Sequence, residues 1–132
     1  MKYIAIDLGL KRIGIAYSAH KDIVTPFPAV IRKNRNQASS EVKKIIDEWE
    51  ADAVVIGIPL GGSSEDEMRR RIEHFMNLVD FKGEVIYQDE AGTSKEAEAL
   101  IKGEIKQIRD GRVDSISAKI ILERYLLSIK YK

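Results

Sequence analysis

The sequence predicts an α/β fold in which a mixed β-sheet carries helices on its faces. Before residue 32 there are three short segments typical of strands, and no segment with helical spacing separates them. Beyond residue 36, segments with apolar residues at helical spacing alternate with short apolar runs. Strands in direct succession pair antiparallel, whereas strands joined through helices pair in parallel by right-handed crossovers. The five expected strands therefore form a mixed sheet.

Three strands are expected at the start of the chain. Residues 2–7 are rich in Ile and Tyr, and residues 12–18 alternate in the manner of a half-buried strand. The short link between these two segments favours a hairpin. Residues 23–31 form the third strand, but Pro26 and Pro28 cannot donate hydrogen bonds to a neighbouring strand, so this strand is expected at an edge or with a bulge.

The rest of the chain alternates between helices and strands. The run at 53–58 is continuously apolar, as in a strand buried on both faces. Ser63 and Ser64 are available to cap the helix that follows this strand. The expected elements are a helix over 37–50, a strand over 53–58, a helix around 68–79, a strand over 84–88, a short helix over 93–102 and a final helix over 113–128.

Composition limits the class of protein. The chain has 132 residues, of which 44% are hydrophobic and 33% charged, and one domain spanning residues 1–132 is expected. The lack of cysteine excludes a disulfide scaffold, a thiol nucleophile and a thiolate metal site. No run is long and apolar enough for a signal peptide or a membrane span. We therefore expect a soluble cytoplasmic protein with no membrane partner, and the sequence leaves its oligomeric state open.

The net charge of +1 conceals an uneven distribution of charge. Residues 1–35 contain seven Lys and Arg against two acidic residues, whereas residues 36–90 contain six against thirteen. The basic beginning can create a local positive field. The acidic middle is interpreted as solvated helix faces, which offset the basic segment in the total.

Acidic residues occur at three places that a metal-dependent site could use. Asp7 ends the first strand, Asp89 and Glu90 end the last strand, and Asp114 opens the final helix. Mg²⁺ is held by carboxylates, and two such ions can activate a water and stabilise a leaving oxygen. Each position also has a simpler interpretation: a turn residue, a solvated loop charge and a helix N-cap, respectively. Strand alternation does not say which of Asp89 and Glu90 faces the site.

Basic residues suited to phosphate occur in two early segments. Two of them follow Gly9 in the expected hairpin turn, where the alternative is a solvated hairpin tip. Residues 31–37 are a candidate mobile loop that grips nucleic acid, with an ordinary polar connector as the alternative. The triplet 69–71 covers most sides of a helix and is interpreted as surface. The candidate nucleic-acid-binding residues are Lys11, Arg12, Arg32, Lys33 and Arg35.

Four separated blocks of the sequence resemble one family over nearly the whole chain. They are Asp7-x-Gly-x-Lys-Arg-Ile-Gly-Ile-Ala16, Val55-Ile-Gly-Ile-Pro-Leu60, Asp89-Glu90 with Thr93 and Ala97-Glu98, and Asp114-Ser-Ile-Ser-Ala118 with Ile121-Leu122 and Tyr125-Leu126. In this respect the chain resembles the YqgF/RuvX family of the ribonuclease H-like superfamily. These bacterial proteins are described as Holliday junction resolvases and as nucleases that process pre-16S rRNA.

The resemblance implies a ribonuclease H-like three-layer fold and a metal-dependent nuclease. It places the catalytic, metal-binding carboxylates on Asp7, Glu90 and Asp114, with Mg²⁺ or Mn²⁺ as the cofactor. It also implies that Lys11 and Arg12 approach the nucleic-acid backbone. The implied reaction is hydrolysis of phosphodiester bonds in structured RNA, at the 5' end of pre-16S rRNA, with pre-ribosomal particles as partners.

The chain departs from the family pattern next to the second acidic position. The family reads Asp-Glu-Arg-Leu where this sequence has Asp-Glu-Ala91-Gly92, which removes a guanidinium that could pair with phosphate. The segment after Leu60 is also shorter than the corresponding segment of the family pattern. Two alternatives therefore stay open: a Holliday junction resolvase that acts on branched DNA, and a catalytically weakened RNA-binding module with the same fold.

Overall fold

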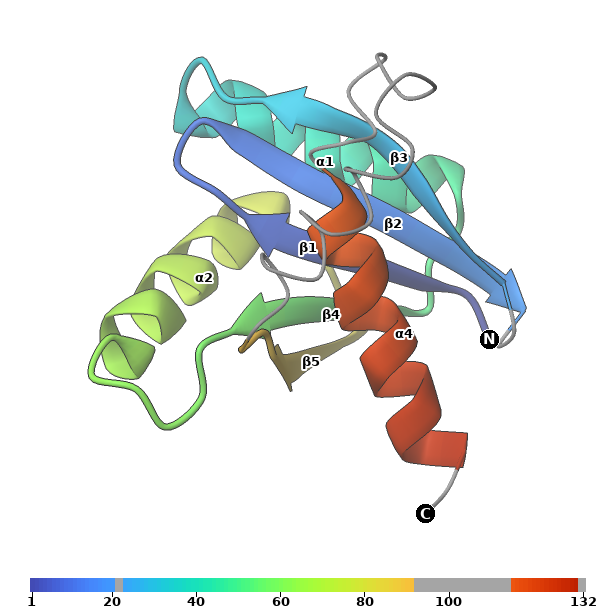
Figure 1. The fold of residues 1–132 in the computed structure, drawn as a ribbon. Helices are drawn as coiled ribbons and strands as arrows, with labels where there is room; N and C mark the ends of the chain where they lie inside the picture. The colour runs from blue at the N-terminus through green and yellow to red at the C-terminus, as the bar shows by residue number, and fades with distance from the viewer. Residues whose placement is uncertain (21–22, 92–114, 131–132) are drawn as a thin grey trace, which may run out of the picture.

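The structure is a computed structural model that describes residues 1–20, 23–91 and 115–130 (Figure 1). Five strands lie in these ranges, and the helices described there are α1, α2 and α4. The strands are β1 (Tyr3–Leu8), β2 (Arg12–His20), β3 (Ile23–Ile31), β4 (Ala53–Ile58) and β5 (Glu84–Asp89). The helices are α1 (Arg35–Glu48), α2 (Glu65–Val79) and α4 (Ile116–Lys130).

The strands form one mixed sheet in the order β3-β2-β1-β4-β5. The pairs β1–β2 and β2–β3 are antiparallel, whereas β1–β4 and β4–β5 are parallel. This confirms the predicted five-stranded mixed sheet. β1 lies at its centre, because the chain leaves β3 through α1 and returns to the other side of β1. The carboxyl ends of β1, β4 and β5 consequently meet at one edge of the sheet.

Helices cover both faces of the sheet, as predicted. In Figure 1, α4 crosses one face, while α1 and α2 lie on the other. Large aliphatic side chains of the strands, such as Ile6 and Ile56, pack against α1 and α2. Small side chains such as Ala5 and Ala16 face α4 instead. The small residues let α4 lie close to the strands, and this close approach shapes the site described below.

Strand β3 is an edge strand with irregular pairing, as its prolines predict. The β2–β3 register shifts twice, once between Ile13 and Ile15 and once between Tyr17 and His20. Pro26 sits opposite Ala16 at the outer edge of the sheet. The shift near Ile15 leaves its backbone N–H to pair outside the β2–β3 ladder.

Helix α1 begins earlier than predicted. The helix starts at Arg35 because Asn34 and Gln37 form a capping box, in which Gln37 N donates to Asn34 Oδ1 at 2.8 Å. The predicted mobile loop over 31–37 is therefore wrong in its second half, which is the first turn of a helix. Ser64 occupies the N-cap of α2, yet its side chain makes no capping hydrogen bond, contrary to the expected role.

Two predictions fall wholly or partly outside the described residues. The short helix over 93–102 lies there, as does the beginning of the predicted helix over 113–128. The described part of that last helix runs two residues further than expected, to Lys130. Among the helices that the structure describes, none combines the length and apolar character needed to cross a bilayer.

Candidate active site

Asp7 and Glu90 lie on the same face of the sheet. Side chains alternate along a strand, so Asp7 shares the α4 face with Ala5. On β5, Asp89 pairs with Ile58, whose side chain is in the core on the α1/α2 side. The next residue, Glu90, continues the pairing through its N–H, which donates to Ile58 O at 3.1 Å. Alternation therefore directs Glu90 to the α4 face, together with Asp7.

Gly57 leaves room for the Glu90 carboxylate. Strand β4 lies between β1 and β5, so the backbones that carry Asp7 and Glu90 are separated by two strand spacings, roughly 10 Å. A Cβ atom at Gly57 would lie 2.8 Å from Glu90 Oε2 and would also collide with Ile121 of α4. The glycine thus permits both the close packing of α4 and the position of the Glu90 carboxylate over β4, between β1 and β5.

Each of these two carboxyl groups ionises less readily than usual. Burial raises the pKa of Asp7. The pKa of Glu90 rises to about 7, first because burial disfavours the charged form and then because the Asp7 and Asp89 carboxylates repel it. A half-buried carboxyl group whose ionisation is opposed by burial and by a neighbouring carboxylate favours the binding of a cation.

Asp89 has a different task. Its Oδ1 accepts from Leu60 N at 3.4 Å and from Ala91 N at 3.1 Å. The Asp89 side chain therefore links the segments that leave β4 and β5. Of the two acidic residues that sequence alternation left undecided, the fold directs Glu90 toward Asp7 and uses Asp89 to hold the surrounding backbone.

Arg124, in α4, is a residue that the sequence analysis did not name as a candidate for the site. Its Nη1 donates to Ala91 O at 2.7 Å, directly after Glu90. A guanidinium is thus present near position 91 even though the family arginine at that position is replaced by alanine. The contact joins residues 33 positions apart, so no local sequence pattern could have indicated it.

Ser115 anchors the start of the last helix to the sheet. Its fully buried side chain accepts a hydrogen bond from Ile15 N at 2.9 Å and donates to Phe27 O. Ile15 follows Gly14, which pairs with Asp7 in the β1–β2 ladder. The anchor therefore lies close to Asp7. Asp114, the third predicted carboxylate, lies outside the described residues.

The hairpin turn and the end of β3 bring three of the predicted basic residues together. Arg32 N donates to Lys11 O at 2.8 Å, and Arg12 pairs with Ile31 at the end of the β2–β3 ladder. Lys11 and Arg12 are exposed at this tip. Lys33 instead lines a groove between β3 and α1. The predicted basic residues thus do not form a single patch.

The donor set fits a hard divalent cation. Carboxylate oxygens are the ligands that Mg²⁺ prefers, and bound metal would offset the repulsion between Asp7 and Glu90. Within the described ranges, no cluster of three or more His, Asp or Glu side chains suited to a metal occurs. In the described part of the chain, two carboxyl groups, those of Asp7 and Glu90, thus share this face of the sheet without a third beside them.

Comparison with known proteins identifies the family. The model of the family described as "RuvX: Holliday junction resolvase" matches residues 1–128. A relative from Sulfurimonas denitrificans, named "Putative pre-16S rRNA nuclease", is 75% identical over 126 residues, which cover 96% of this chain and 97% of the relative. A relative with the same name from Campylobacter lari is 51% identical over 125 residues, with 95% and 97% covered.

Solved structures confirm the predicted ribonuclease H-like fold. RuvC from Thermus thermophilus in complex with a Holliday junction substrate has a TM-score of 0.61 at 12% identity, covering 98% of this chain and 96% of that chain. The Holliday junction resolvase of fowlpox virus has a TM-score of 0.59 at 16% identity, covering 97% and 99%. The family model matches residues 1–128, and sequence identity to the Sulfurimonas denitrificans relative reaches 75%. The chain therefore belongs to the RuvX family and is a nuclease, a hydrolase acting on ester bonds.

Proposed function

We propose that this nuclease uses a divalent metal ion to hydrolyse phosphodiester bonds in structured RNA, at the 5' end of pre-16S rRNA. The observation that carries the proposal is the pair Asp7 and Glu90. Their carboxyl groups share one face of the sheet at the ends of β1 and β5, and the pKa of Glu90 rises partly because of Asp7. The names of the relatives supply the RNA class.

Asp7 and Glu90 would hold Mg²⁺ or Mn²⁺ as catalytic residues, and Asp114 is proposed as their third partner. Asp114 directly precedes Ser115, whose hydrogen bond to Ile15 N fixes the beginning of α4 beside Asp7. Consecutive Cα atoms are about 3.8 Å apart, so this anchor supports including Asp114. When bound, the metal supplies Lewis-acid stabilisation of charge at the scissile phosphate.

The remaining residues of the proposed site orient the groups that react. Asp89 and Arg124 hold the backbone directly after Glu90, since Ala91 N donates to Asp89 Oδ1 and Arg124 Nη1 donates to Ala91 O. Lys11, Arg12, Arg32, Lys33 and Arg35 are proposed to contact the nucleic-acid backbone. Such contacts position the strand without reading its bases. Pre-ribosomal particles in the cytoplasm would present this substrate.

A second candidate substrate is a branched DNA junction. It is favoured by the description of the matching family and by the RuvC complex among the similar structures. Both substrates are phosphodiesters in structured nucleic acid, so the same carboxylates would serve either reaction.

Cleavage assays on both substrates test the proposal. We expect the wild type to cut a fragment that spans the 5' end of 16S rRNA when Mn²⁺ or Mg²⁺ is present, and to cut a four-way DNA junction less efficiently. Asp7→Asn and Glu90→Gln should abolish cleavage. Asp89→Asn is the matched control, since asparagine retains an oxygen that can accept the two backbone hydrogen bonds.

Three outcomes contradict parts of this proposal. If the protein cleaves the DNA junction in preference to the RNA, the branched DNA junction and not pre-16S rRNA is its substrate. Binding of RNA without cleavage, unchanged in Asp7→Asn and Glu90→Gln, would identify a binding module that has lost catalysis. Equal loss of activity in Asp89→Asn and Glu90→Gln would contradict the division of roles between these neighbours.

A further inference from the structure

A cavity of about 310 Å³ lies where α1, α2 and the end of β1 meet. Its apolar lining consists of Leu8 and Phe75, which are both buried. The rest of its described lining contains nitrogen-bearing side chains and no carboxylate. We call this cavity the arginine pocket; its polar residues are Arg32, Arg35, Arg70, Arg71 and His74.

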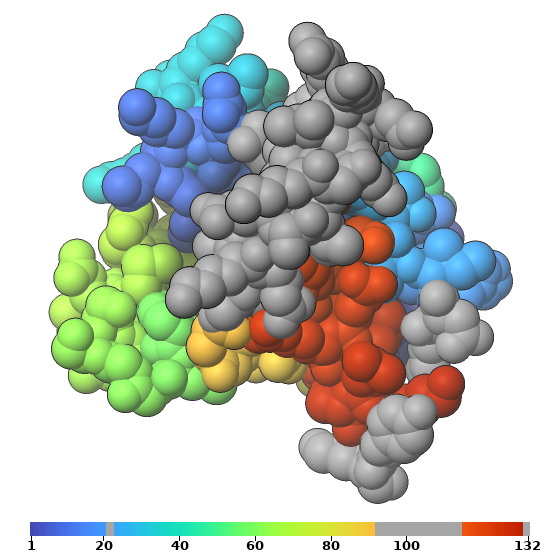
Figure 2. All heavy atoms as spheres, in the orientation of Figure 1, coloured from blue at the N-terminus to red at the C-terminus, as the bar shows by residue number. Residues whose placement is uncertain are grey.

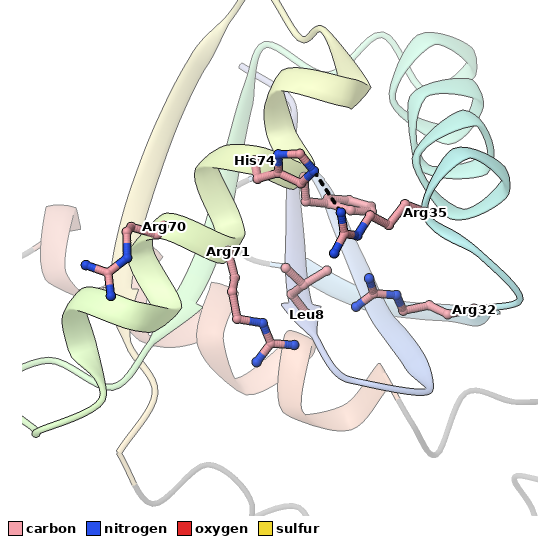
Figure 3. A pocket seen from close by; sticks show the side chains of 7 residues that line it. Leu8, Arg32, Arg35, Arg70, Arg71 and His74 are labelled. Atoms are coloured by element: carbon pink, nitrogen blue, oxygen red, sulfur yellow. Dashed lines mark hydrogen bonds between the residues drawn. The ribbon is translucent and has the colours of Figure 1, made fainter.

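The guanidinium groups of the arginine pocket come from separate elements. Arg32 follows β3, Arg35 is the first residue of α1, and Arg71 belongs to α2. Figure 3 shows these three side chains reaching toward Leu8 from different directions, whereas Arg70 points outward from α2. The packing of α1 against α2 therefore creates the pocket. Of the triplet 69–71, which the sequence analysis interpreted as surface, Arg71 therefore contributes to this pocket, while Arg70 is exposed.

The three inward-pointing arginines lack acidic partners in the part of the chain that the structure describes. Arg32 Nη1 donates to Gly9 O at 2.8 Å. Arg35 Nη1 lies 3.3 Å from His74 Nε2. Arg71 Nη1 lies 3.6 Å from a methionine sulfur one turn earlier in α2. None of the ion pairs among the described residues includes any of these three guanidinium groups.

The positive charges of the pocket act on one another. Burial lowers the pKa of Arg32, and the charges of Arg71 and Arg35 lower it further. An arginine does not lose its proton in a protein at neutral pH, so deprotonation cannot relieve this repulsion. A bound anion can, because each guanidinium presents a fork of N–H donors that suits phosphate oxygens.

We propose that the arginine pocket binds a phosphate group of the nucleic-acid substrate, at a site separate from the carboxylates that act on the scissile bond. This inference rests on the proposed function and extends it. The pocket lies on the α1/α2 face and the carboxylates lie on the α4 face, at the same end of β1. A nucleic-acid strand bound at both the arginine pocket and the carboxylates would pass around the tip of the β1–β2 hairpin.

The connection between the two sites supports nucleic acid as the ligand. Leu8 in the pocket directly follows Asp7, and alternation places their side chains on opposite faces of β1. Arg32 joins the pocket to the hairpin turn through Gly9. On the face shown in Figure 2, this hairpin and α2 lie next to each other at the surface. A polymer with a regular row of phosphates can occupy the pocket and the carboxylate site at the same time, which a small anion cannot.

Binding measurements with matched arginine variants test the inference. The background is Asp7→Asn without divalent metal, so that no substrate is cut, and the probe is a labelled rRNA-precursor hairpin titrated over a range of salt concentrations. We expect Arg35→Gln and Arg71→Gln each to weaken binding about tenfold, as for loss of a charge-assisted hydrogen bond. Each should also lower the slope of log affinity against log salt by about one.

Arg69→Gln is the matched control. It removes the same charge from the same turn of α2, but Arg69 pairs with Glu65 at 3.3 Å and lies over the Tyr87 ring at 4.7 Å, outside the pocket. Its affinity and salt slope should match those of the background protein. Arg35 is exposed at the first residue of α1, so Arg35→Gln tests the pocket even if Arg71→Gln proves unstable.

Two probe arms identify the source of the phosphate. If removal of the 5'-phosphate from the hairpin weakens binding to the background protein but not to Arg35→Gln, the pocket takes a terminal phosphate. If its removal affects neither protein, while Arg35→Gln still binds more weakly, the pocket takes an internal phosphodiester. Both results support the inference.

The inference is overturned if Arg35→Gln and Arg71→Gln bind the RNA hairpin as tightly as the background protein does. It is equally overturned if Arg69→Gln loses as much affinity for the hairpin as these two variants do. It is also overturned if polyglutamate competes for the pocket as well as RNA does, since that would indicate an acidic protein partner. Failure of the proposed nuclease activity has a different signature. Cleavage would then be absent in the wild type, whatever the binding of the pocket variants.

Discussion

Glu90 shows how its surroundings determine the chemistry of a single residue. An exposed glutamate at the end of an edge strand would be a solvated charge, which was the simpler interpretation of the sequence. In the fold, Glu90 is half-buried, lies over Gly57 and is repelled by Asp7, so its pKa rises to about 7. A bound cation would offset the unfavourable free energy of ionising Glu90, because it neutralises the carboxylate charge.

The pH dependence of stability should report this effect. Without divalent metal, folded Glu90 keeps its proton up to about pH 7, whereas the unfolded chain releases it near the ordinary glutamate pKa of 4.5. The folded state then binds more protons, so the free energy of unfolding falls as pH rises through this window. Each pKa unit corresponds to about 1.4 kcal/mol, so the rise from 4.5 to about 7 sets an upper bound of roughly 3.5 kcal/mol, which solvent screening of a half-buried group reduces.

Urea unfolding at a series of pH values checks this expectation. Glu90→Gln should show a smaller decrease between about pH 5 and pH 7, because the raised pKa of Asp7 still contributes, and it should be more stable than the wild type at higher pH. Glu67→Gln, which removes an exposed carboxyl group from the first turn of α2, should keep the decrease. Identical pH profiles for Glu90→Gln and the wild type would show that Glu90 is not responsible.

Gly57 should matter more for activity than for stability. In Gly57→Ala the new methyl group would meet two atoms at the ends of flexible side chains, Glu90 Oε2 and Ile121 Cδ1. The half-buried Glu90 side chain yields more easily than the fully buried Ile121, and the carboxylate then leaves its position. We expect cleavage to fall about 10- to 100-fold, the scale of an ångström-sized misplacement, with a small change in melting temperature.

The control for Gly57 is Gly62→Ala. The nearest atom to its added Cβ would be Pro59 O at 3.9 Å, an ordinary contact. Gly62→Ala should therefore retain activity. A fully active Gly57→Ala would mean that the position of Glu90 does not depend on the space over this glycine.

At the scale of elements, helix α4 is attached to the sheet by a polar anchor as well as by apolar packing. Ser115 is fully buried among apolar neighbours, and its hydroxyl satisfies the Ile15 N–H that the β2–β3 register shift leaves outside the ladder. The extra residue of β3 at this register shift and the serine before α4 are therefore complementary features. They connect segments 100 positions apart in the sequence.

Ser115→Ala should be destabilising for this reason. It would leave the buried Ile15 N–H without an acceptor, which costs about 1–3 kcal/mol. Chemical denaturation measures the loss. Ser128→Ala on the same helix is the control, because that exposed hydroxyl donates to Tyr125 O within α4 and should contribute little. Equal effects of the two substitutions would contradict the anchoring role of Ser115.

Local patterns predicted the elements well where one residue type or one spacing was decisive. The continuous apolar run of β4 and the prolines of β3 each led to the observed position in the sheet. The start of α1 was misplaced because its arginines and asparagines suggested a loop. The pair Asn34 and Gln37 carried the correct signal, since a polar N-cap followed three residues later by glutamine is a capping box.

At the scale of the whole molecule, the sheet separates two kinds of charge. The acidic pair Asp7 and Glu90 belongs to the α4 face, and the arginine pocket belongs to the α1/α2 face. A net charge of +1 is compatible with a nucleic-acid enzyme under this arrangement, because several arginines gather in one pocket near the hairpin and can create a local positive field there.

Metal binding should stabilise the entire fold. A ligand that binds only the folded state raises stability in proportion to the logarithm of its concentration above its Kd. At a pH above 7, where Glu90 is ionised in the folded protein, Mn²⁺ should raise the melting temperature of the wild type, and EDTA should reverse the increase. Asp7→Asn should respond much less. An equal response of both proteins in a thermal-shift measurement would place the metal elsewhere.

The sequence by itself determined the order and type of the described strands and helices, because apolar spacing, prolines and short links act over a few residues. It also determined Asp7 and the Asp89-Glu90 pair as candidates, through their places at strand ends. Only the tertiary structure decided that Glu90 rather than Asp89 turns toward Asp7, because this depends on the register of β5 against β4. The arginine pocket likewise exists only where α1 packs against α2, since contacts between distant segments arise from packing and leave no local periodicity to detect.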